Sequence, residues 1–199
     1  MPRPDLTEQR TAEILDAFER CIVRHGLDGS SLEKIGEEAG MKRPILRHYV
    51  GNREALVMAL AERVIERWNE QLVSLREAPA GEDPAATLIG YLFDDLSGQS
   101  ADAILVAENL IAAADRHPEV GELMRQYVAD LTKVICGRLK MVHAGAPQAQ
   151  RWRVAYGLVA ILFNDASLAP LGLAPRFTRA SRDCATLLVD SLAAGRAGE

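Results

Sequence analysis

The chain has 199 residues and a formal net charge of −5 at pH 7, and its 48 % hydrophobic content provides a sizeable core and excludes a disordered protein. Because it has no run of about 18 apolar residues and no signal peptide at its start, we expect a cytoplasmic protein without a membrane span. The three cysteines, Cys21, Cys136 and Cys184, are far apart in apolar helical patterns, which is typical of free thiols in a reducing compartment.

The first helix is expected from Thr7 to His25, with Gly26 at its C-terminal end. Its buried side is predicted by apolar residues at helical spacing, namely Ile14, Phe18, Cys21 and Ile22. A short turn then leads to residues 30–49, which carry the clearest local signals of the chain.

A short second helix is predicted at the start of this segment. Ser30 and Glu33 form a capping-box pattern, in which the carboxylate reaches back to the N–H of the cap. Gly40 is expected to end the helix in the left-handed conformation that residues with a Cβ resist. Gly36 provides a small residue where a following helix must approach closely.

A third short helix follows the glycine turn. Pro44 is tolerated in its first turn, because the N–H that proline lacks would be unpaired there. Three apolar residues are spaced to pack back on the preceding helix, namely Ile45, Leu46 and Tyr49. Two short helices joined by a tight glycine turn are typical of a helix-turn-helix.

The third helix lies in a stretch without carboxylates, since no acidic residue occurs between Glu38 and Glu54. Residues 1–53 contain equal numbers of acidic and basic side chains, so the net charge of −5 arises from the rest of the chain. The cations in or beside this helix are Lys42, Arg43, Arg47, His48 and Arg53. Cations grouped in this way favour a surface that binds DNA phosphates. The alternative is an ordinary helical hairpin with a solvated basic face.

Two segments carry a family resemblance: ILDAFERCIVRHG, and SSLEKIGEEAGMKRPILRHYVGNREAL after it. Over residues 14–60 they resemble the N-terminal DNA-binding domain of TetR-family transcriptional regulators. The pattern departs from the family at Lys42, Arg47 and Val50, where members often carry Ser or Thr, Tyr, and Phe. Carried onto this chain, the resemblance and the charge pattern predict these DNA-binding residues: Ser31, Lys42, Arg43, Pro44, Arg47, His48, Tyr49 and Arg53.

The remainder of the chain reads as helical throughout, with no alternating strand pattern. A long helix is expected over residues 53–78, and the resemblance makes it the lever between a ligand site and DNA. Further helices are expected over residues 84–96, 101–115, 118–139, 148–168 and 178–194. The prediction is an all-α protein of about nine helices, with a DNA-binding domain at residues 1–52 and a ligand-binding and dimerisation domain at residues 53–199.

A small-molecule site is implied by the resemblance, between the long helix and the helices after it. The candidate lining residues are Trp68, Phe93, Asn109, Tyr127, Trp152 and Phe163. Asn109 interrupts the apolar run AILVAENLIAAA, and a buried amide needs a hydrogen-bond partner. The alternative is that the aromatic residues are core and that Asn109 bonds a neighbouring helix. The effector is unknown.

The last two helices are expected to form a homodimer interface, because residues 148–168 are apolar on more than one side and residues 178–194 carry one apolar side. The predicted protein is a repressor that binds a palindromic double-stranded operator and is released by a small molecule. Two alternatives are an all-α ligand-binding protein without DNA binding and a helical enzyme. No P-loop, GxSxG, HExxH or zinc-type cysteine spacing occurs, so we expect no enzyme, metal or cofactor.

Overall fold

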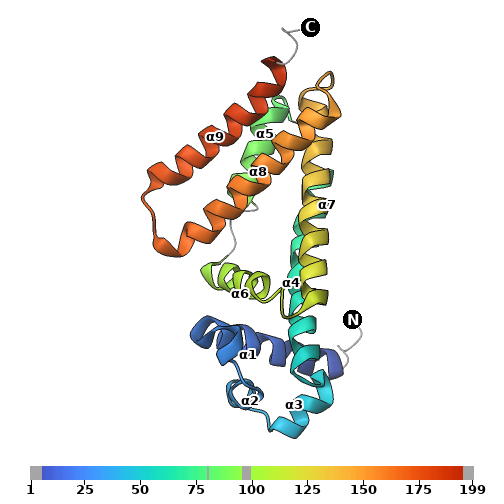
Figure 1. Cartoon of the computed structure of the whole chain (residues 1–199), viewed down its shortest axis with the longest axis vertical. Coiled ribbons are helices and arrows are strands. Elements are labelled where there is room, and N and C mark those ends of the chain that lie inside the picture. The colour runs from blue at the N-terminus through green and yellow to red at the C-terminus, as the bar shows by residue number, and fades with distance from the viewer. Residues whose placement is uncertain (1–5, 80, 96–99, 195–199) are drawn as a thin grey trace. The chain divides into compact units, whose positions relative to one another are not determined.

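The computed structural model describes residues 6–79, 81–95 and 100–194, and within these ranges the chain forms nine α-helices and no strand. The all-α class and the helix count expected from the sequence are therefore confirmed. A π-helical turn, η1 (Tyr91–Asp95), and a 3-10 turn, η2 (Ala169–Leu171), complete the regular structure of these ranges. The helices in chain order are α1 (Leu6–Gly29), α2 (Leu32–Ala39), α3 (Arg43–Val50), α4 (Arg53–Glu77), α5 (Pro84–Gly90), α6 (Ala101–Ala112), α7 (Pro118–Val142), α8 (Gln148–Leu168) and α9 (Pro175–Ala194) (Figure 1).

Several helix ends differ from those predicted. The last helix begins at Pro175 instead of residue 178, because proline is well suited to a first helical position. The helix predicted over residues 101–115 ends at Ala112, where the chain enters a turn. The helix predicted over residues 84–96 changes into the π-helical turn η1 after Gly90, and residue 96 lies outside the described residues.

The chain divides into two compact units. The first contains the described residues up to Glu66 together with Ser100–Met124, and the second contains the others. Helices α4 and α7 therefore contribute residues to both units, because the divisions fall after Glu66 and after Met124. The division between residues 52 and 53 predicted from the sequence is one of function, and it stays a prediction.

In the first unit, α1 packs against α2, α3 and α6 (Figure 1). Arg63 of α4 adds polar contacts to α1, because its guanidinium pairs with Asp16 and Glu19 and donates to the carbonyl oxygen of Ala12 at 3.4 Å. The fully buried side chains that form the centre of this unit include Ile14, Phe18, Ile22, Ile35, Leu46 and Leu110. The short helices α2 and α3 are thus held on a common core.

The first turn of α2 corrects the predicted cap. Ser31 is the N-cap, and its Oγ accepts a hydrogen bond from the N–H of Lys34 at 3.3 Å. Ser30 is fully buried, and its Oγ donates to the carbonyl oxygen of Gly26 at 2.7 Å, so it completes the end of α1 instead. Because the cap lies one residue later, Glu33 is not at the capping-box position, and its carboxylate pairs with Arg43.

The turn between α2 and α3 depends on two glycines, as the sequence predicts. Gly40 ends α2 at φ 65°, and its N–H donates to the carbonyl oxygen of Glu37 at 3.2 Å. The N–H of Met41 donates to the carbonyl oxygen of Gly36 at 2.8 Å. A Cβ added to Gly36 would lie only 2.8 Å from the carbonyl oxygen of Met41, so the turn passes too close to α2 for any side chain.

Replacing Gly36 with alanine is therefore expected to destabilise the first unit by about 1–3 kcal/mol, the usual range for overpacking a tight site. The control is Gly137→Ala in α7, where an added Cβ meets nothing within 4 Å. That substitution is expected to stabilise the protein by about 0.5–1 kcal/mol, because alanine is the better helix former. Urea denaturation of both variants measures the difference, and equal midpoints would contradict the close approach at Gly36.

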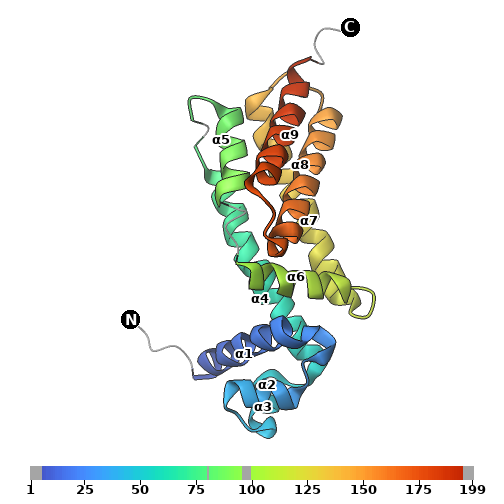
Figure 2. The ribbon, with the colours of Figure 1, turned by 90° about the vertical axis from the view of Figure 1, so that its left-hand side faces the viewer.

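In the second unit, α8 and α9 run antiparallel and lie side by side in both views (Figures 1 and 2). Their shared core contains Ala155 and Leu158 of α8 and Ala185, Val189 and Leu192 of α9. The end of α4 is held in the same unit by Arg138 of α7, whose guanidinium donates to the carbonyl oxygens of Ala78 at 2.6 Å and Pro79 at 3.3 Å. These bonds satisfy carbonyl groups that the helix end leaves without partners.

Candidate nucleic-acid interface and ligand-binding residues

Helix α3 presents a cationic outer side. Its two buried apolar residues are four positions apart and therefore share the inner side of the helix, whereas its cations are exposed. Leu46 and Val50 are buried, which fixes the inner side of this eight-residue helix. Lys42 is the N-cap residue, and its ammonium, which can only donate hydrogen bonds, makes no capping bond. The exposed residues predicted to contact DNA are Lys42, Arg43, Pro44, Arg47 and His48.

Two of the three carboxylates of α2, those of Glu33 and Glu38, are paired with cations of the neighbouring helices. Glu33 lies 2.5 Å from Arg43 of α3, and Glu38 lies 2.6 Å from both Arg20 and Arg24 of α1. The hydrogen bond from Arg20 is the main reason why the pKa of Glu38 is lowered. The pKa of Glu33 is lowered by a hydrogen bond from its own backbone N–H and by Arg43.

Lys42 and Arg47 differ from these paired cations. Within the described part of the chain, neither side chain forms an ion pair, and both residues are exposed. Lys34 of α2, by comparison, donates to the carbonyl oxygen of Gly29 at 2.9 Å. The positive charge available on this side of the first unit is therefore concentrated at the start and the middle of α3.

Two predicted DNA-binding residues have bonds inside the first unit. The guanidinium of Arg53 is half-buried and donates to the carbonyl oxygens of Leu27, at 2.5 Å, and Ser30. Each of its terminal nitrogens therefore makes one bond inside the first unit, and the DNA contact of Arg53 stays a prediction. Ser31 caps α2, so its hydroxyl oxygen is also used, although the hydroxyl proton can still be donated.

Tyr49 and Ile45 are four residues apart, so they lie on one side of α3. Tyr49 is half-buried, and its ring lies edge-on to that of His48, with centroids 5.1 Å apart. Ile45 was expected to pack inward but is 46 % exposed. Once Leu46 and Val50 are taken as the inner side, the helical spacing turns Ile45 outward, so the sequence did contain the signal. Ile45 is an additional candidate for apolar contact with DNA, because a thymine methyl group offers such a surface.

Two of the predicted ligand residues are in contact in the second unit. Trp68 of α4 and Tyr127 of α7 are in contact, with ring centroids 4.7 Å apart and an interplanar angle of 41°. Both are buried, and burial raises the pKa of Tyr127 well above its usual range. Phe93 is buried in the π-helical turn η1, whereas Phe163 of α8 is half-buried.

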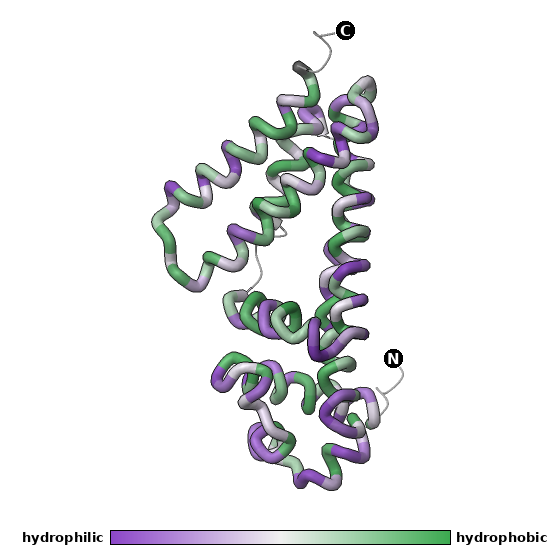
Figure 3. Tube along the Cα trace, in the orientation of Figure 1, coloured by the Kyte–Doolittle hydropathy of each residue, from purple (hydrophilic) through white to green (hydrophobic). Residues whose placement is uncertain are grey.

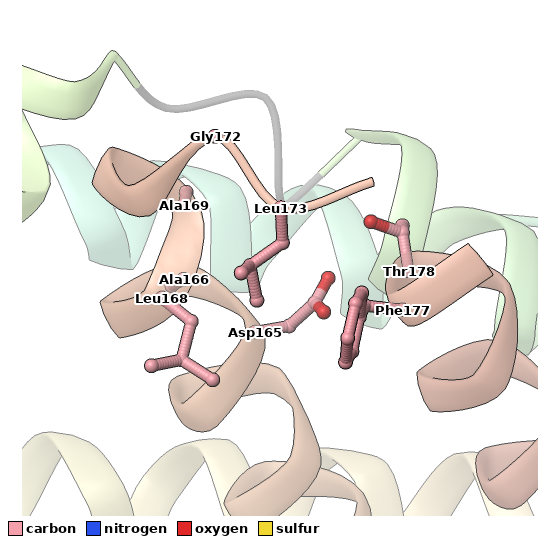
Figure 4. A pocket seen from close by; sticks show the side chains of 8 residues that line it. All are labelled: Asp165, Ala166, Leu168, Ala169, Gly172, Leu173, Phe177 and Thr178. Carbon is pink, nitrogen blue, oxygen red and sulfur yellow. The ribbon is translucent and has the colours of Figure 1, made fainter. Parts of the chain in front are cut away.

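Described residues of the second unit line two surface cavities that could hold a small molecule, among others. One, of about 280 Å³, is at the turn between α8 and α9, where Leu173 and Phe177 lie beside the carboxylate of Asp165 (Figure 4). Asp165 accepts a hydrogen bond from Ser181 at 2.9 Å. The other is a groove between α7 and α8 that includes Trp152. Neither is lined by Trp68, Phe93, Tyr127 or Phe163.

Asn109 of α6 has a structural role in the first unit. Its Oδ1 accepts the N–H of Leu27 at 3.0 Å, and its Nδ2 donates to the carbonyl oxygen of Leu105 at 2.9 Å. The N–H of Leu27 needs this partner because α1 is broken at Gly26, where φ is 69°. Arg116 adds a two-pronged pair to Asp28, at 2.8 and 2.7 Å. This geometry matches the alternative in which Asn109 bonds a neighbouring helix.

Apolar residues occur along much of α8 and at intervals along α9 (Figure 3), and several of them are exposed. The stretch Gln148–Leu171 is long and apolar enough to cross a membrane by length and composition, and 22 % of its most apolar window is buried. One such stretch is weak evidence for a span, and a second protein surface would cover it equally well. We call the following exposed residues the outer face: Tyr156, Leu168, Leu171, Leu173, Phe177 and Leu187.

Comparisons with known proteins agree with this arrangement. Residues 14–60 match the family described as bacterial regulatory proteins, tetR family. The HTH-type transcriptional regulator BetI of Burkholderia mallei is 26 % identical over 200 residues, covering 98 % of this chain and 100 % of BetI. Two solved structures share the fold. A TetR transcription regulator from Haloarcula marismortui is 16 % identical with a TM-score of 0.75, covering 92 % of this chain and 98 % of that one. The multidrug binding protein EbrR, complexed with imidazole, is 17 % identical with a TM-score of 0.64, covering 94 % and 96 %.

Proposed function

Because the chain is a member of the TetR family of DNA-binding transcriptional regulators, and not an enzyme, we propose that it is a homodimeric repressor. In this proposal it acts in the cytoplasm, binds a palindromic operator through α3 of each subunit, and is released by a small-molecule effector. The observation that carries the proposal is the pair of exposed cations, Lys42 and Arg47, at the start and in the middle of α3, neither of which has an ion pair in the described ranges.

DNA contact is assigned to the outer side of α3. Lys42 and Arg47 are free to meet phosphates or base edges in a major groove, which admits one α-helix. Arg43 can join them only after leaving Glu33, since that pair is 2.5 Å long and exposed. Pro44, Ile45, His48 and Tyr49 complete the contacting surface, whereas Arg53 and Ser31 contribute by holding α2 and α4 in place.

Dimerisation is assigned to the outer face. Two copies that pair through α8 and α9 would cover these apolar side chains in a four-helix arrangement with two-fold symmetry. The symmetry also provides what an operator with two half-sites requires, namely two recognition helices that enter successive major grooves. A monomer, by comparison, would leave Tyr156 58 % exposed and Leu187 69 % exposed.

Release by an effector is supported by analogy with EbrR, a multidrug binding protein. In this chain the best-supported ligand residues are Trp68 and Tyr127, because they belong to α4 and α7, the two helices that extend through both units. An effector that prefers one arrangement of these helices shifts the population of the dimer toward that arrangement.

The proposal is tested by an electrophoretic mobility shift with the DNA that flanks the chain's own gene, against DNA of the same length and scrambled sequence. We expect a shift for the flanking DNA that persists when scrambled competitor is added, and a stoichiometry of one dimer per site. Binding that scrambled DNA removes would contradict a sequence-specific regulator. A complete absence of binding at low salt would favour a helical ligand-binding protein without DNA binding.

Helix α4 is proposed as the lever that couples the effector to DNA. Glu62 and Glu66 are exposed on it, so Glu62→Gly/Glu66→Gly should soften the helix by about 1 kcal/mol per residue without removing a core contact. Coupling between two ligands is typically ~1–3 kcal/mol and is reciprocal. We expect this variant to bind effector as tightly as wild type when DNA is absent, but to be released from DNA less effectively.

The control for the lever is Glu62→Ala/Glu66→Ala, which removes the same carboxylates and keeps a stiff helix. Its response to effector should equal that of the wild type. Operator affinity with and without effector, measured by fluorescence anisotropy, gives the coupling in all three proteins. If the glycine variant is released as readily as the alanine variant, α4 is not the lever.

A further inference from the structure

The groove between α7 and α8 has the volume of a small-molecule site. Its volume is about 380 Å³, which lies in the range of small-ligand pockets. It lies close to the turn that joins the two helices, and all of its residues belong to the second unit. The lining residues are Lys133, Cys136, Gly137 and Lys140 of α7 and Gln148, Arg151 and Trp152 of α8.

The charge of the groove is positive and only partly compensated. None of the lining residues is acidic, and the cations are Lys133, Lys140 and Arg151. Lys133 is 2.9 Å from Asp130, whereas Lys140 has no ion pair in the described part of the chain. The Nη1 of Arg151 donates to the carbonyl oxygen of Ala146, but its Nε is buried without a hydrogen-bond partner. A buried donor without a partner is uncommon, so the protein itself satisfies the guanidinium of Arg151 only in part.

The N-terminus of α8 adds to this positive character. Pro147 is the N-cap and supplies no side-chain capping bond, and no acidic residue lies in the first turn of this 21-residue helix. The first N–H groups of a helix carry partial positive charge and favour anions. Arg151 lies close to these groups, although a positive charge is unfavourable at the start of a helix. No acidic side chain in the first turn balances the charge of Arg151.

Trp152 provides an apolar wall beside these cations. Its side chain is 42 % exposed, and Gly137 opposite it leaves open space where a side chain would otherwise stand. We propose that this groove binds a small organic anion in which a carboxylate or phosphate group is attached to a planar ring. The anionic group accepts hydrogen bonds from Lys140 and Arg151, and the ring packs on Trp152.

This site is distinct in its residues from the Trp68–Tyr127 contact, and its occupation requires neither DNA nor the proposed operator. Failure of the groove to bind an anion would therefore leave the proposed regulator unaffected, and failure of DNA binding would leave the groove unaffected. The two proposals are thus tested by separate measurements on the same purified protein.

The probe is phenyl phosphate, titrated into the full-length protein while tryptophan fluorescence is recorded. The chain has two tryptophans, of which Trp152 is exposed and Trp68 is buried. The variant Trp152→Phe should therefore lose the fluorescence change, while calorimetry should still detect binding of phenyl phosphate. We expect saturable quenching by phenyl phosphate and by benzoate, and no effect of benzyl alcohol, which has the ring without the charge. Equal binding of benzyl alcohol would overturn the assignment of the groove to anions.

Inorganic phosphate tests the contribution of the ring, and it should bind at least about tenfold more weakly than phenyl phosphate if the ring packs on Trp152. Lys140→Gln should weaken phenyl phosphate about fivefold, the upper end for a partly exposed charge pair. Lys133→Gln/Lys140→Gln should weaken it further and flatten its salt dependence. The control, Arg76→Gln/Arg179→Gln, removes two exposed cations of the same unit that do not line the groove. If the lysine variant and this control bind phenyl phosphate equally well, the proposal is wrong.

Discussion

Replacing Leu187 with glutamate is expected to convert the proposed dimer into monomers and to abolish operator binding. The side chain is 69 % exposed on α9, so the substitution leaves the core of the single subunit intact. In a dimer paired through the outer face, two-fold symmetry places the new charge in the interface twice. An uncompensated buried charge costs about 3–5 kcal/mol, which exceeds what a two-fold interface of this kind can lose while remaining associated at micromolar concentration.

Sedimentation velocity of the wild type, of Leu187→Glu and of Val73→Glu provides the test. Val73 is 47 % exposed on α4, so its substitution introduces the same charge on an exposed apolar position outside the outer face. Only Leu187→Glu should sediment as a monomer with unchanged helical content. A Leu187→Glu protein that remains dimeric, or a wild type that is monomeric at micromolar concentration, would contradict the interface through α8 and α9.

The neighbouring residue shows why sequence periodicity alone did not define this interface. Leu188 belongs to the apolar side of α9 that the sequence indicates, but it faces Gly157 of α8 in the same subunit, where an added Cβ would lie 3.0 Å from Leu188 Cδ1. A charge at Leu188 would therefore disturb folding of the subunit. The sequence of α9 shows which of its residues are apolar. The packing of α8 on α9 decides which of these residues stay exposed and available to a partner subunit.

Local signals were predicted well where the physical cause was local. Gly36 and Gly40 follow from a close approach and a helix end within a few residues of the chain. The cap was misplaced by one residue because Ser30 and Ser31 are chemically alike, and only the break of α1 at Gly26 determines that Ser30 is buried. Helix count and class followed from periodicity.

Long-range bonds were not predictable in this way. The guanidinium of Arg53 reaches carbonyl groups more than twenty positions earlier in the chain, and Asn109 bonds Leu27 across a distance of 82 residues in sequence. No pattern in one helix specifies such a partner. The groove between α7 and α8 was not predictable either. Its cations lie on two helices, and only the packing of α7 on α8 makes them neighbours.

The double variant Lys42→Gln/Arg47→Gln is expected to weaken operator binding. The loss of binding free energy should be about 2–6 kcal/mol if both side chains contact the operator, because one base contact typically contributes about 1–3 kcal/mol. Each contact to a phosphate that is lost should also lower the slope of log affinity against log salt by about 0.9. The two residues are chosen because neither has an ion pair in the described ranges, so their removal leaves no carboxylate without a partner.

The control for this prediction, Arg76→Gln/Arg179→Gln, changes the net charge equally but at exposed positions of the second unit. Its operator affinity and its salt slope should stay near those of the wild type, which separates a contact from a general effect of charge. Glu33→Gln provides the opposite arm, because it releases Arg43 from its pair, which is 2.5 Å long, and removes a negative charge beside α3. That variant should bind DNA more tightly and gain about 0.9 in salt slope if Arg43 then meets a phosphate. If Lys42→Gln/Arg47→Gln keeps the affinity and slope of the wild type across the salt series, the outer side of α3 does not contact DNA.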